Sequence, residues 1–505
     1  MAAVPFGPDM PGATSTRVVR VGRALGARDV ARLDAVIVMG TAGKSSDLKS
    51  QPFAAELRRS LARRRLETSA VRTVRLAGRR GTVCLYGAAK PEASMFERLQ
   101  LAGRLGRALE EFPARRLGVV TLATDSAQAS RNLEALIAAL WARAYRLPRF
   151  KGTTDRGADG QELRVFSQHA LNLDRLAAEA RGNGLARWLT ALPANVLTPA
   201  SYRRLIAGLA RKHDWRLKFL GRPALERLGA GAFLAVTQAH DAEGGIVQLK
   251  YRPRGATQTP VVALVGKGVC FDTGGVNLKP HRSMLDMHTD MGGSAVALAV
   301  LEALTMLKFP FAVDAWLALA ENQIGPRAYK PQDVVRAVNG TTIQVIHSDA
   351  EGRMLLADTL ALAARERPRM ILDFATLTGA CVSALSERYA GIFTNRPALR
   401  AGLEAAGSAS GERVWAFPMD DDFDSDIESR VADVAQCAVD ARADHILAAR
   451  FLKRFVPDEI AWAHVDLAPS ERKGGLGHVT TDITGFGVRY ALNLLLDSGI
   501  LAGLR

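Results

Sequence analysis

The chain has 505 residues, 48% of them hydrophobic, and a formal net charge of +16. A chain of this length is expected to form two to four domains with buried cores. No apolar run is long enough for a membrane-spanning helix, which argues against an integral membrane protein. The four cysteines are scattered and form no CxxC pair, which argues against a disulfide framework and a thiolate metal site and favours a cytoplasmic protein.

The positive charge is concentrated in the N-terminal third. Residues 1–150 contain 26 Lys and Arg against 12 Asp and Glu, a net of +14; the remaining residues contain 41 against 39, a net of +2. The favoured interpretation is a solvated, arginine-rich helix face. The alternative is an electrostatic footprint for a polyanion, giving weak DNA binding. The candidate residues for that role are Arg58, Arg59, Arg63, Arg64 and Arg65.

The N-terminal third also has the pattern of a separate α/β domain. Apolar runs at 35–39, 82–87 and 117–122 predict strands, and the segments near 96–111 and 128–146 predict helices. A polar, glycine-bearing stretch then predicts a domain boundary. We therefore expect a basic α/β domain over 1–165, a linker region over 166–199 with a helix at 174–190, and a larger domain over 200–505.

The larger domain alternates predicted strands with predicted helices. Its strands are expected at 261–266, 313–320, 341–346, 369–375 and 460–468. Such alternation predicts a mostly parallel sheet covered by helices on both faces. The expected fold class is thus α/β, with a small N-terminal domain followed by a larger one. Ligands of such sheets bind at the carboxyl ends of the strands.

Two stretches that follow predicted strands gather acidic residues. Lys267 comes directly after the run at 261–266, and residues 268, 274 and 275 are glycines that indicate a tight loop. Carboxylates that face one another repel unless a cation lies between them. Oxygen ligands suit Mg²⁺, Mn²⁺ or Zn²⁺. The sequence therefore predicts a divalent metal site built from Asp272, Asp290, Asp349 and Glu351.

The second stretch, HSDAEGR at 347–353, allows two local interpretations. In an extended segment Asp349, Glu351 and Arg353 would share one face. Alternatively, Ser348 and Glu351 would form a helix capping box without any metal. The glycines and lysines of the first stretch also have ordinary interpretations, as turn residues and solvated surface charges. The missing GxxxxGK[ST] spacing argues against a phosphate loop.

Five blocks carry a resemblance to a known family. They are GKGVCFDTGG at 266–275, DMGG at 290–293, HSDAEGRM at 347–354, ATLTGAC at 375–381 and AHVDLA at 463–468. In this order they resemble the leucine aminopeptidase family of dinuclear-metal exopeptidases, whose signature is NTDAEGRL. The resemblance covers roughly residues 180 to 490. His347, Ser348 and Met354 depart from the signature, but none of them is a carried-over ligand or catalytic residue.

The resemblance implies a metal-dependent aminopeptidase that releases Leu-like residues from the N-termini of peptides. It implies two divalent ions per chain, Mn²⁺ or Zn²⁺, and a metal-bridging hydroxide as nucleophile. Lys279 would stabilise the tetrahedral intermediate, and Arg353 would hold a bicarbonate ion as general base. It also implies a cytoplasmic homohexamer. The implied ligands are Lys267, Asp272, Asp290, Asp349 and Glu351, and the implied substrate-pocket residues are Met287, Thr376 and Gly379.

Two hypotheses from other classes compete with a working peptidase. One is a catalytically inactive relative kept as a structural protein, against which the presence of all seven ligand and catalytic residues argues. The other is a DNA-binding protein of the same family whose peptidase activity is incidental.

Overall fold

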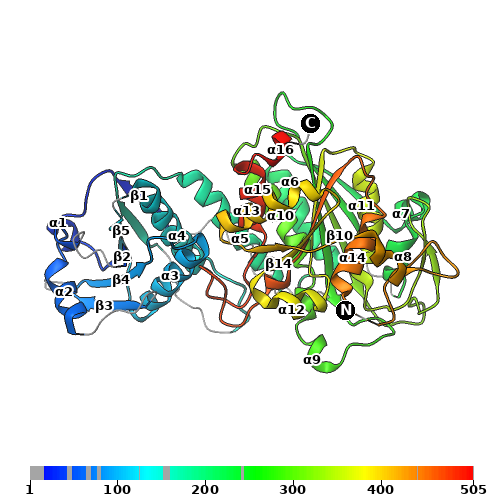
Figure 1. Cartoon of the computed structure of the whole chain (residues 1–505), viewed down its shortest axis with the longest axis horizontal. Helices are drawn as coiled ribbons and strands as arrows, with labels where there is room; N and C mark the ends of the chain where they lie inside the picture. Colours follow the sequence, from blue (N-terminus) through cyan, green and yellow to red (C-terminus); the bar gives the residue numbers. More distant parts are fainter. Residues whose placement is uncertain are drawn as a thin grey trace.

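The computed structural model describes residues 16–42, 48–63, 70–76, 81–123, 125–151, 160–239, 244–440 and 442–503. It has two lobes, each built on its own β-sheet, and the long helix α5 (Leu173–Thr190) runs between them (Figure 1). Both sheets are mostly parallel and carry helices, so the predicted α/β fold class is confirmed. In the part of the chain that is described, no helix is long and apolar enough to cross a membrane.

The N-terminal lobe contains the first sheet. Among the described residues it has six strands in the order β1-β6-β5-β2-β4-β3, and each neighbouring pair is parallel except β3 with β4. Three of these strands, β2, β4 and β5, were predicted from the sequence. The strand bounds are β1 (Arg17–Val21), β2 (Ala35–Thr41), β3 (Val71–Arg75), β4 (Val83–Ala89), β5 (Arg116–Thr121) and β6 (Glu162–Phe166).

Helices cover both faces of the first sheet. Those on one face, α3 and α4, share an apolar core with alternate residues of the strands, and α2 closes a smaller core on the other face. Their apolar residues recur at helical spacing, which directs one side of each helix to the sheet. The helix bounds are α1 (Ala27–Val30), α2 (Ala54–Arg63), α3 (Met95–Ala108) and α4 (Ser126–Ala144).

The C-terminal lobe contains the larger sheet. Its eight strands within the described residues have the order β15-β14-β17-β13-β9-β10-β8-β7, and the four central strands, β17 to β10, are mutually parallel. A small sheet of β11 (Val334–Arg336), β12 (Thr342–Gln344) and β16 (Val434–Ala435) lies beside it. The large sheet consists of β7 (Arg216–Gly221), β8 (Gly245–Tyr251), β9 (Val262–Asp272), β10 (Val313–Asn322), β13 (Met370–Ala375), β14 (Ala390–Thr394), β15 (Val414–Ala416) and β17 (Ala461–Asp466).

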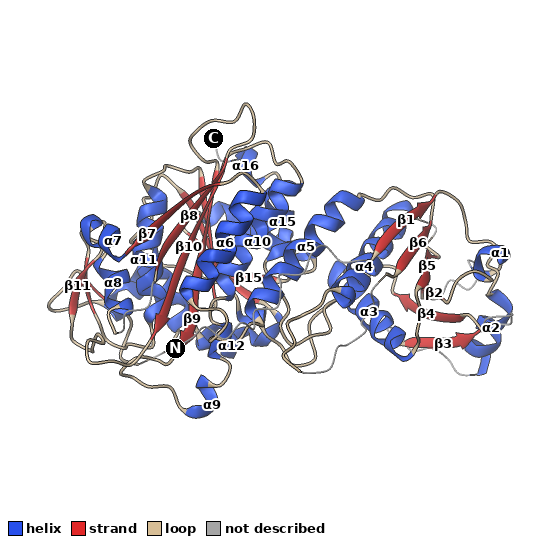
Figure 2. Ribbon diagram, turned by 180° about the vertical axis from the view of Figure 1, so that it is seen from behind, coloured by secondary structure: helices blue, strands red, loops and turns tan. Residues whose placement is uncertain are grey.

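The large sheet is buried on both faces (Figure 2). Val262 and Leu264 of β9 face one core, whereas Ala263 and Val265 face the other, as the alternation of side chains along a strand requires. The first core is closed by α5, α6 (Pro199–Lys212), α10 (Gly292–Met306), α13 (Arg400–Ser410) and α15 (Val488–Leu496). The second is closed by α7 (Arg222–Leu228), α8 (Gly231–Thr237), α11 (Glu351–Ala364) and α14 (Asp444–Lys453).

Strand β9 differs from its prediction. It runs on to Asp272 because β10 pairs with it along its whole length, so Lys267 lies within the strand and not after its end. Gly266 is needed there for packing, since a Cβ would lie 2.5 Å from the Cα of Ser294 on α10. Only Gly274 and Gly275, with φ of +86° and +65°, form the predicted turn.

The expected division into domains stays a prediction. The first sheet ends with β6, and α5, which follows it, packs against both α4 and α10 and so joins the two lobes. The predicted boundary stretch overlaps residues 152–159, which lie outside the described part of the chain. The described residues also form three short helices, α9 (His281–Met284), α12 (Gly379–Leu385) and α16 (Ile500–Gly503).

Candidate metal centre

The site lies at the carboxyl ends of the central parallel strands. Asp272 ends β9, Asn322 ends β10, and Asp466 ends β17. Thr376 follows directly after β13. These strands are neighbours in the sheet, so their ends converge at one edge, where α/β sheets bind ligands.

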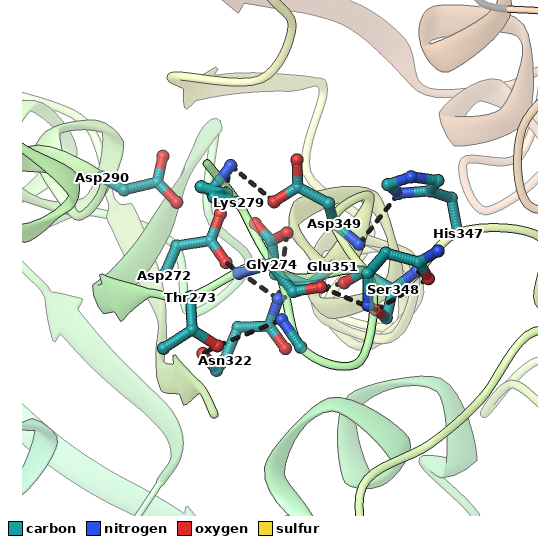
Figure 3. Close-up of polar contacts among 12 residues, drawn as sticks. Asp272, Thr273, Gly274, Lys279, Asp290, Asn322, His347, Ser348, Asp349 and Glu351 are labelled. Atoms are coloured by element: carbon teal, nitrogen blue, oxygen red, sulfur yellow. Dashed lines mark hydrogen bonds and ion pairs between the residues drawn. The ribbon is translucent and has the colours of Figure 1, made fainter. Parts of the chain in front are cut away.

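Acidic side chains converge at this edge. Carboxylate oxygens of Asp272, Asp290 and Glu351 lie within 4.8 Å of one another, and all three residues are buried. Asp290 follows a short 3₁₀ turn before α10, and Glu351 is the first residue of α11. Asp349 lies on the other side of the Lys279 ammonium (Figure 3).

Two lysines stand between the carboxylates. The Nζ of Lys267 lies 2.8 Å from Asp290 and 3.0 Å from Glu351, and it also donates to the carbonyl oxygen of Thr376 at 2.9 Å. The Nζ of Lys279 lies 3.0 Å from Asp272 and 2.5 Å from Asp349. Four carboxylates thus share two ammonium groups.

The negative charge of the four carboxylates exceeds the positive charge of the two lysines. Burial raises the pKa of Glu351 to about 8, and the charge of Asp272 adds to the rise against the opposing effect of Lys267. Burial also raises the pKa of Asp290 to about 6, although Lys267 opposes it. Burial and Asp272 likewise raise the pKa of Asp349. Divalent cations would supply the missing positive charge, so the residues present fit a metal centre.

Burial alone would lower the pKa of Lys267, but Asp290 and Glu351 raise it above its usual range. A lysine ligand requires a neutral amine. Binding of a divalent ion would have to displace a proton from Lys267, as the charge of the ion itself favours.

The loop before α11 differs from both conformations predicted for residues 347–353, the extended segment and the helix capping box. Asp349 lies in a turn, whereas Glu351 and Arg353 belong to α11, so the three residues do not form one extended face. Ser348 is no helix cap either. Its hydroxyl donates to the carbonyl oxygen of Gly274 at 2.6 Å, because the turn after β9 packs against this loop. The capping-box interpretation is therefore wrong.

Several supporting residues were missed at the sequence level. The Nδ2 of Asn322 donates to Asp272 at 2.8 Å and to the carbonyl oxygen of Ser348 at 3.0 Å. Gln436 accepts from the backbone of residues 346 and 347 and donates to the carbonyl oxygen of Ala350. Asn322 could have been found, since it follows the strand predicted at 313–320 as Asp272 follows the one predicted at 261–266; for Gln436 the sequence offers no comparable signal.

The acidic centre lies in a cleft of about 620 Å³. The predicted pocket residues Met287, Thr376 and Gly379 all line it, as do both lysines and the four carboxylates. Arg353 does not line this cleft. A larger hollow, of about 1380 Å³, lies at the amino ends of β13 and β17 and is bordered by three arginines, so it lacks the chemistry of the acidic centre.

Comparison with known proteins agrees with this geometry. Residues 184–492 match the family model described as the cytosol aminopeptidase family, catalytic domain. The chain belongs to the cytosol aminopeptidase family. A probable cytosol aminopeptidase of Synechococcus sp. (strain JA-3-3Ab) is 36% identical over 84% of this chain and 85% of its own length. Another, of Synechococcus sp. (strain CC9605), is 42% identical over 63% of this chain, and the match spans 65% of that relative.

Solved structures share the fold. The bottromycin maturation enzyme BotP in complex with Mn superposes with a TM-score of 0.80 at 31% identity, over 94% of this chain and all of that one. A mutant of tomato leucine aminopeptidase superposes with a TM-score of 0.85 at 25% identity, over 97% and 98% of the two chains. The predicted reaction class, a metal-dependent aminopeptidase, is thereby confirmed. The family gives no support to the DNA-binding alternative.

Proposed function

We propose that this chain is a leucyl-type aminopeptidase that holds two divalent ions in its acidic cleft. The observation that supports the proposal is the meeting of four carboxylates around two lysines, buried Lys267 and half-buried Lys279, at the carboxyl edge of a parallel sheet. The proposed ligands are Lys267, Asp272, Asp290, Asp349 and Glu351. When bound, the ions would supply an activated water and a positive site for the substrate's free amine.

Lys279 is the proposed oxyanion-stabilising residue. Its ammonium is held by Asp272 and Asp349 at the wall of the cleft, where 14% of its side chain is exposed. That position leaves it able to approach the carbonyl oxygen of a peptide lying in the cleft. A cation preorganised in this way stabilises developing negative charge without reorganisation of the site.

The substrate side of the cleft favours a peptide with an apolar first residue. Met287, Val382 and Leu467 supply apolar lining, and Gly379 leaves space where a side chain would otherwise project. Thr376 donates to Asp290 at 2.7 Å and so orients a carboxylate close to this lining. We propose Leu-like and Met-like residues as the preferred N-terminal residues.

The finer assignments rest on the relatives. Manganese is the metal of the related BotP structure, and it is our first candidate here, followed by zinc. The curated relatives carry the name cytosol aminopeptidase, which supports a cytoplasmic location. A homohexamer is proposed from the resemblance to the leucine aminopeptidase family.

The test combines metal removal with a blocked substrate. The protein, stripped with a chelator, should not hydrolyse leucyl-p-nitroanilide, and Mn²⁺, Zn²⁺, Co²⁺ or Mg²⁺ should restore activity to differing extents. N-acetyl-leucyl-p-nitroanilide, which lacks the free amine, should not be cleaved. Full activity after metal removal, or equal cleavage of the blocked substrate, would contradict the proposal.

A further inference from the structure

The guanidinium of Arg353 is already occupied by the protein. Arg353 is in the first turn of α11 and is 2% exposed. Its Nη2 donates to Oδ1 and Oδ2 of Asp444 at 2.9 and 2.7 Å, and its Nη1 donates to the carbonyl oxygen of Gln436 at 3.2 Å. The Nε has no partner, but it is buried. Asp444 therefore takes the Nη2 edge of the guanidinium, and an anion that bound at that edge would have to displace it.

Asp444 is held in place by the fold. It is the first residue of α14, which packs against α11, and Ala443 before it has the left-handed φ of +51°. A carboxylate in the first turn of a helix is stabilised by the helix dipole. The side chain of Asp444 is 21% exposed, so the ion pair with Arg353 is largely shielded from water. The pair is therefore preformed, not a transient surface contact.

This arrangement does not fit a bicarbonate ion on Arg353. The charge of Arg353 is neutralised by Asp444, and the arginine lies outside the lining of the cleft. The carboxylate of Asp444 would also repel a second anion at Arg353, because like charges in a poorly solvated site repel strongly.

We propose that the Asp444 carboxylate takes the place of an external anion beside Arg353, so that the enzyme works without bicarbonate. Asp444 is a positioning residue, because it fixes Arg353 and with it the first turn of α11, which begins with Glu351. Gln436 supports the same turn, since its side chain holds the backbone at His347 and Ala350 while its carbonyl oxygen accepts from Arg353. The inference rests on the proposed aminopeptidase function.

The experiment compares the metal-loaded wild type with D444A in CO₂-free buffer and with added sodium bicarbonate at constant ionic strength. The wild type should respond by less than about twofold, whereas D444A should lose about tenfold in kcat and recover it with bicarbonate but not with chloride, as expected for loss of a charged hydrogen-bond partner. D444E keeps the carboxylate and should stay independent of bicarbonate. D440A, in the exposed loop before α14, is the matched control.

A second readout does not need activity. Bicarbonate should raise the Tm of D444A, which has an open guanidinium, and leave that of the wild type unchanged. If D444A does not fold, the near-isosteric D444N serves in both measurements. Stimulation of the wild type by several-fold, or a D444A enzyme that is fully active and indifferent to bicarbonate, would overturn the inference. A wild type inactive with every metal would instead overturn the proposed function, and the Tm measurement would still decide the role of Asp444.

Discussion

The two lobes have the same architecture but use it differently. Both contain neighbouring parallel strands with helices on each face. In the C-terminal lobe three of the four central strands end in site residues, Asp272 on β9, Asn322 on β10 and Asp466 on β17. In the N-terminal lobe none of the parallel strands ends in an acidic residue, since β1, β2, β4, β5 and β6 end in Val21, Thr41, Ala89, Thr121 and Phe166. The site therefore comes from the residues at the strand ends and not from the sheet itself.

The lobes also differ in what their charges do. The N-terminal third carries most of the net positive charge, and the described arginines of α2, Arg58 and Arg59, are exposed. The C-terminal lobe is nearly neutral but contains buried acidic groups, and burial, with the neighbouring charge of Asp272, raises the pKa of Glu351 and Asp290. One lobe solvates its charges, and the other needs cations to stabilise them.

Removing the carboxylate of Glu351 should have the largest effect on activity. It would leave the strand edge of the C-terminal lobe, like that of the N-terminal lobe, without a complete acidic site. We expect E351A to lose activity by about 10³-fold or more, together with bound metal. Metal analysis should find about two divalent ions per chain in the wild type and fewer in the variant. E226A, which changes an exposed glutamate on α7, is the control. An E351A enzyme with normal activity would rule out this metal centre.

Lys279 should matter for catalysis and not for metal binding. We expect K279A to lower kcat by about 10²-fold while both metals are retained, as for loss of an oxyanion-stabilising group. K330A, at a lysine whose side chain is 66% exposed, should behave as the wild type. Loss of metal from K279A would show that its assigned role is wrong.

The buried carboxyl groups predict a pH-dependent stability of the metal-free protein. Glu351 has a pKa raised from 4.5 to about 8, so the folded chain binds this proton more tightly than the unfolded chain. The free energy of unfolding should therefore fall as the pH rises from about 4.5 to about 8. The Tm of chelator-treated protein should drop by a few degrees between about pH 5 and pH 8, and less so in E351Q. Saturation with metal should remove the trend; a Tm that rises with pH would contradict the assignment.

The contact between the lobes should tune substrate binding. Arg107 of α3 donates to the carbonyl oxygens of Gly474 and Thr480, in a loop that also contributes Arg472 and Asp482 to the cleft wall. We expect R107A to raise KM by about threefold to tenfold and to change kcat by less than about twofold, since hydrogen bonds of this kind contribute roughly 1 kcal/mol. R59A, on the far helix α2, is the control. An unchanged KM would mean that the N-terminal lobe does not support this wall.

Replacing the basic residues of the N-terminal third should have the smallest effect on catalysis. The five-arginine-to-serine variant at positions 58, 59, 63, 64 and 65 should keep wild-type peptidase activity, because the proposed site residues all follow position 260. Residues 64 and 65 and the side chain of Arg63 lie outside the described part of the chain. Titration of duplex DNA between about 50 and 200 mM salt tests the polyanion alternative. Equal binding by both proteins, or none by either, would contradict a DNA-binding role for these arginines.

The sequence alone determined the fold class, eight of the seventeen strands of the described residues, and the acidic group. The periodicity of a strand can be read from a short stretch of chain, and so can the acidic residues that follow it. For this reason the order of residues alone identifies Asp272, Asp290, Asp349 and Glu351. Their roles as ligands stay predictions, but the fold brings all four to one cleft.

Only the tertiary structure decided the partners of these groups. Lys267 lies within β9 because β10 extends the pairing, and Ser348 bonds to the turn at Gly274 because two distant loops meet. Arg353 looked available for an anion in the linear sequence, yet Asp444, 91 residues away, holds it. The type and spacing of a residue determine which groups it can bind, whereas the packing of elements that are remote in the sequence determines which of those groups it contacts.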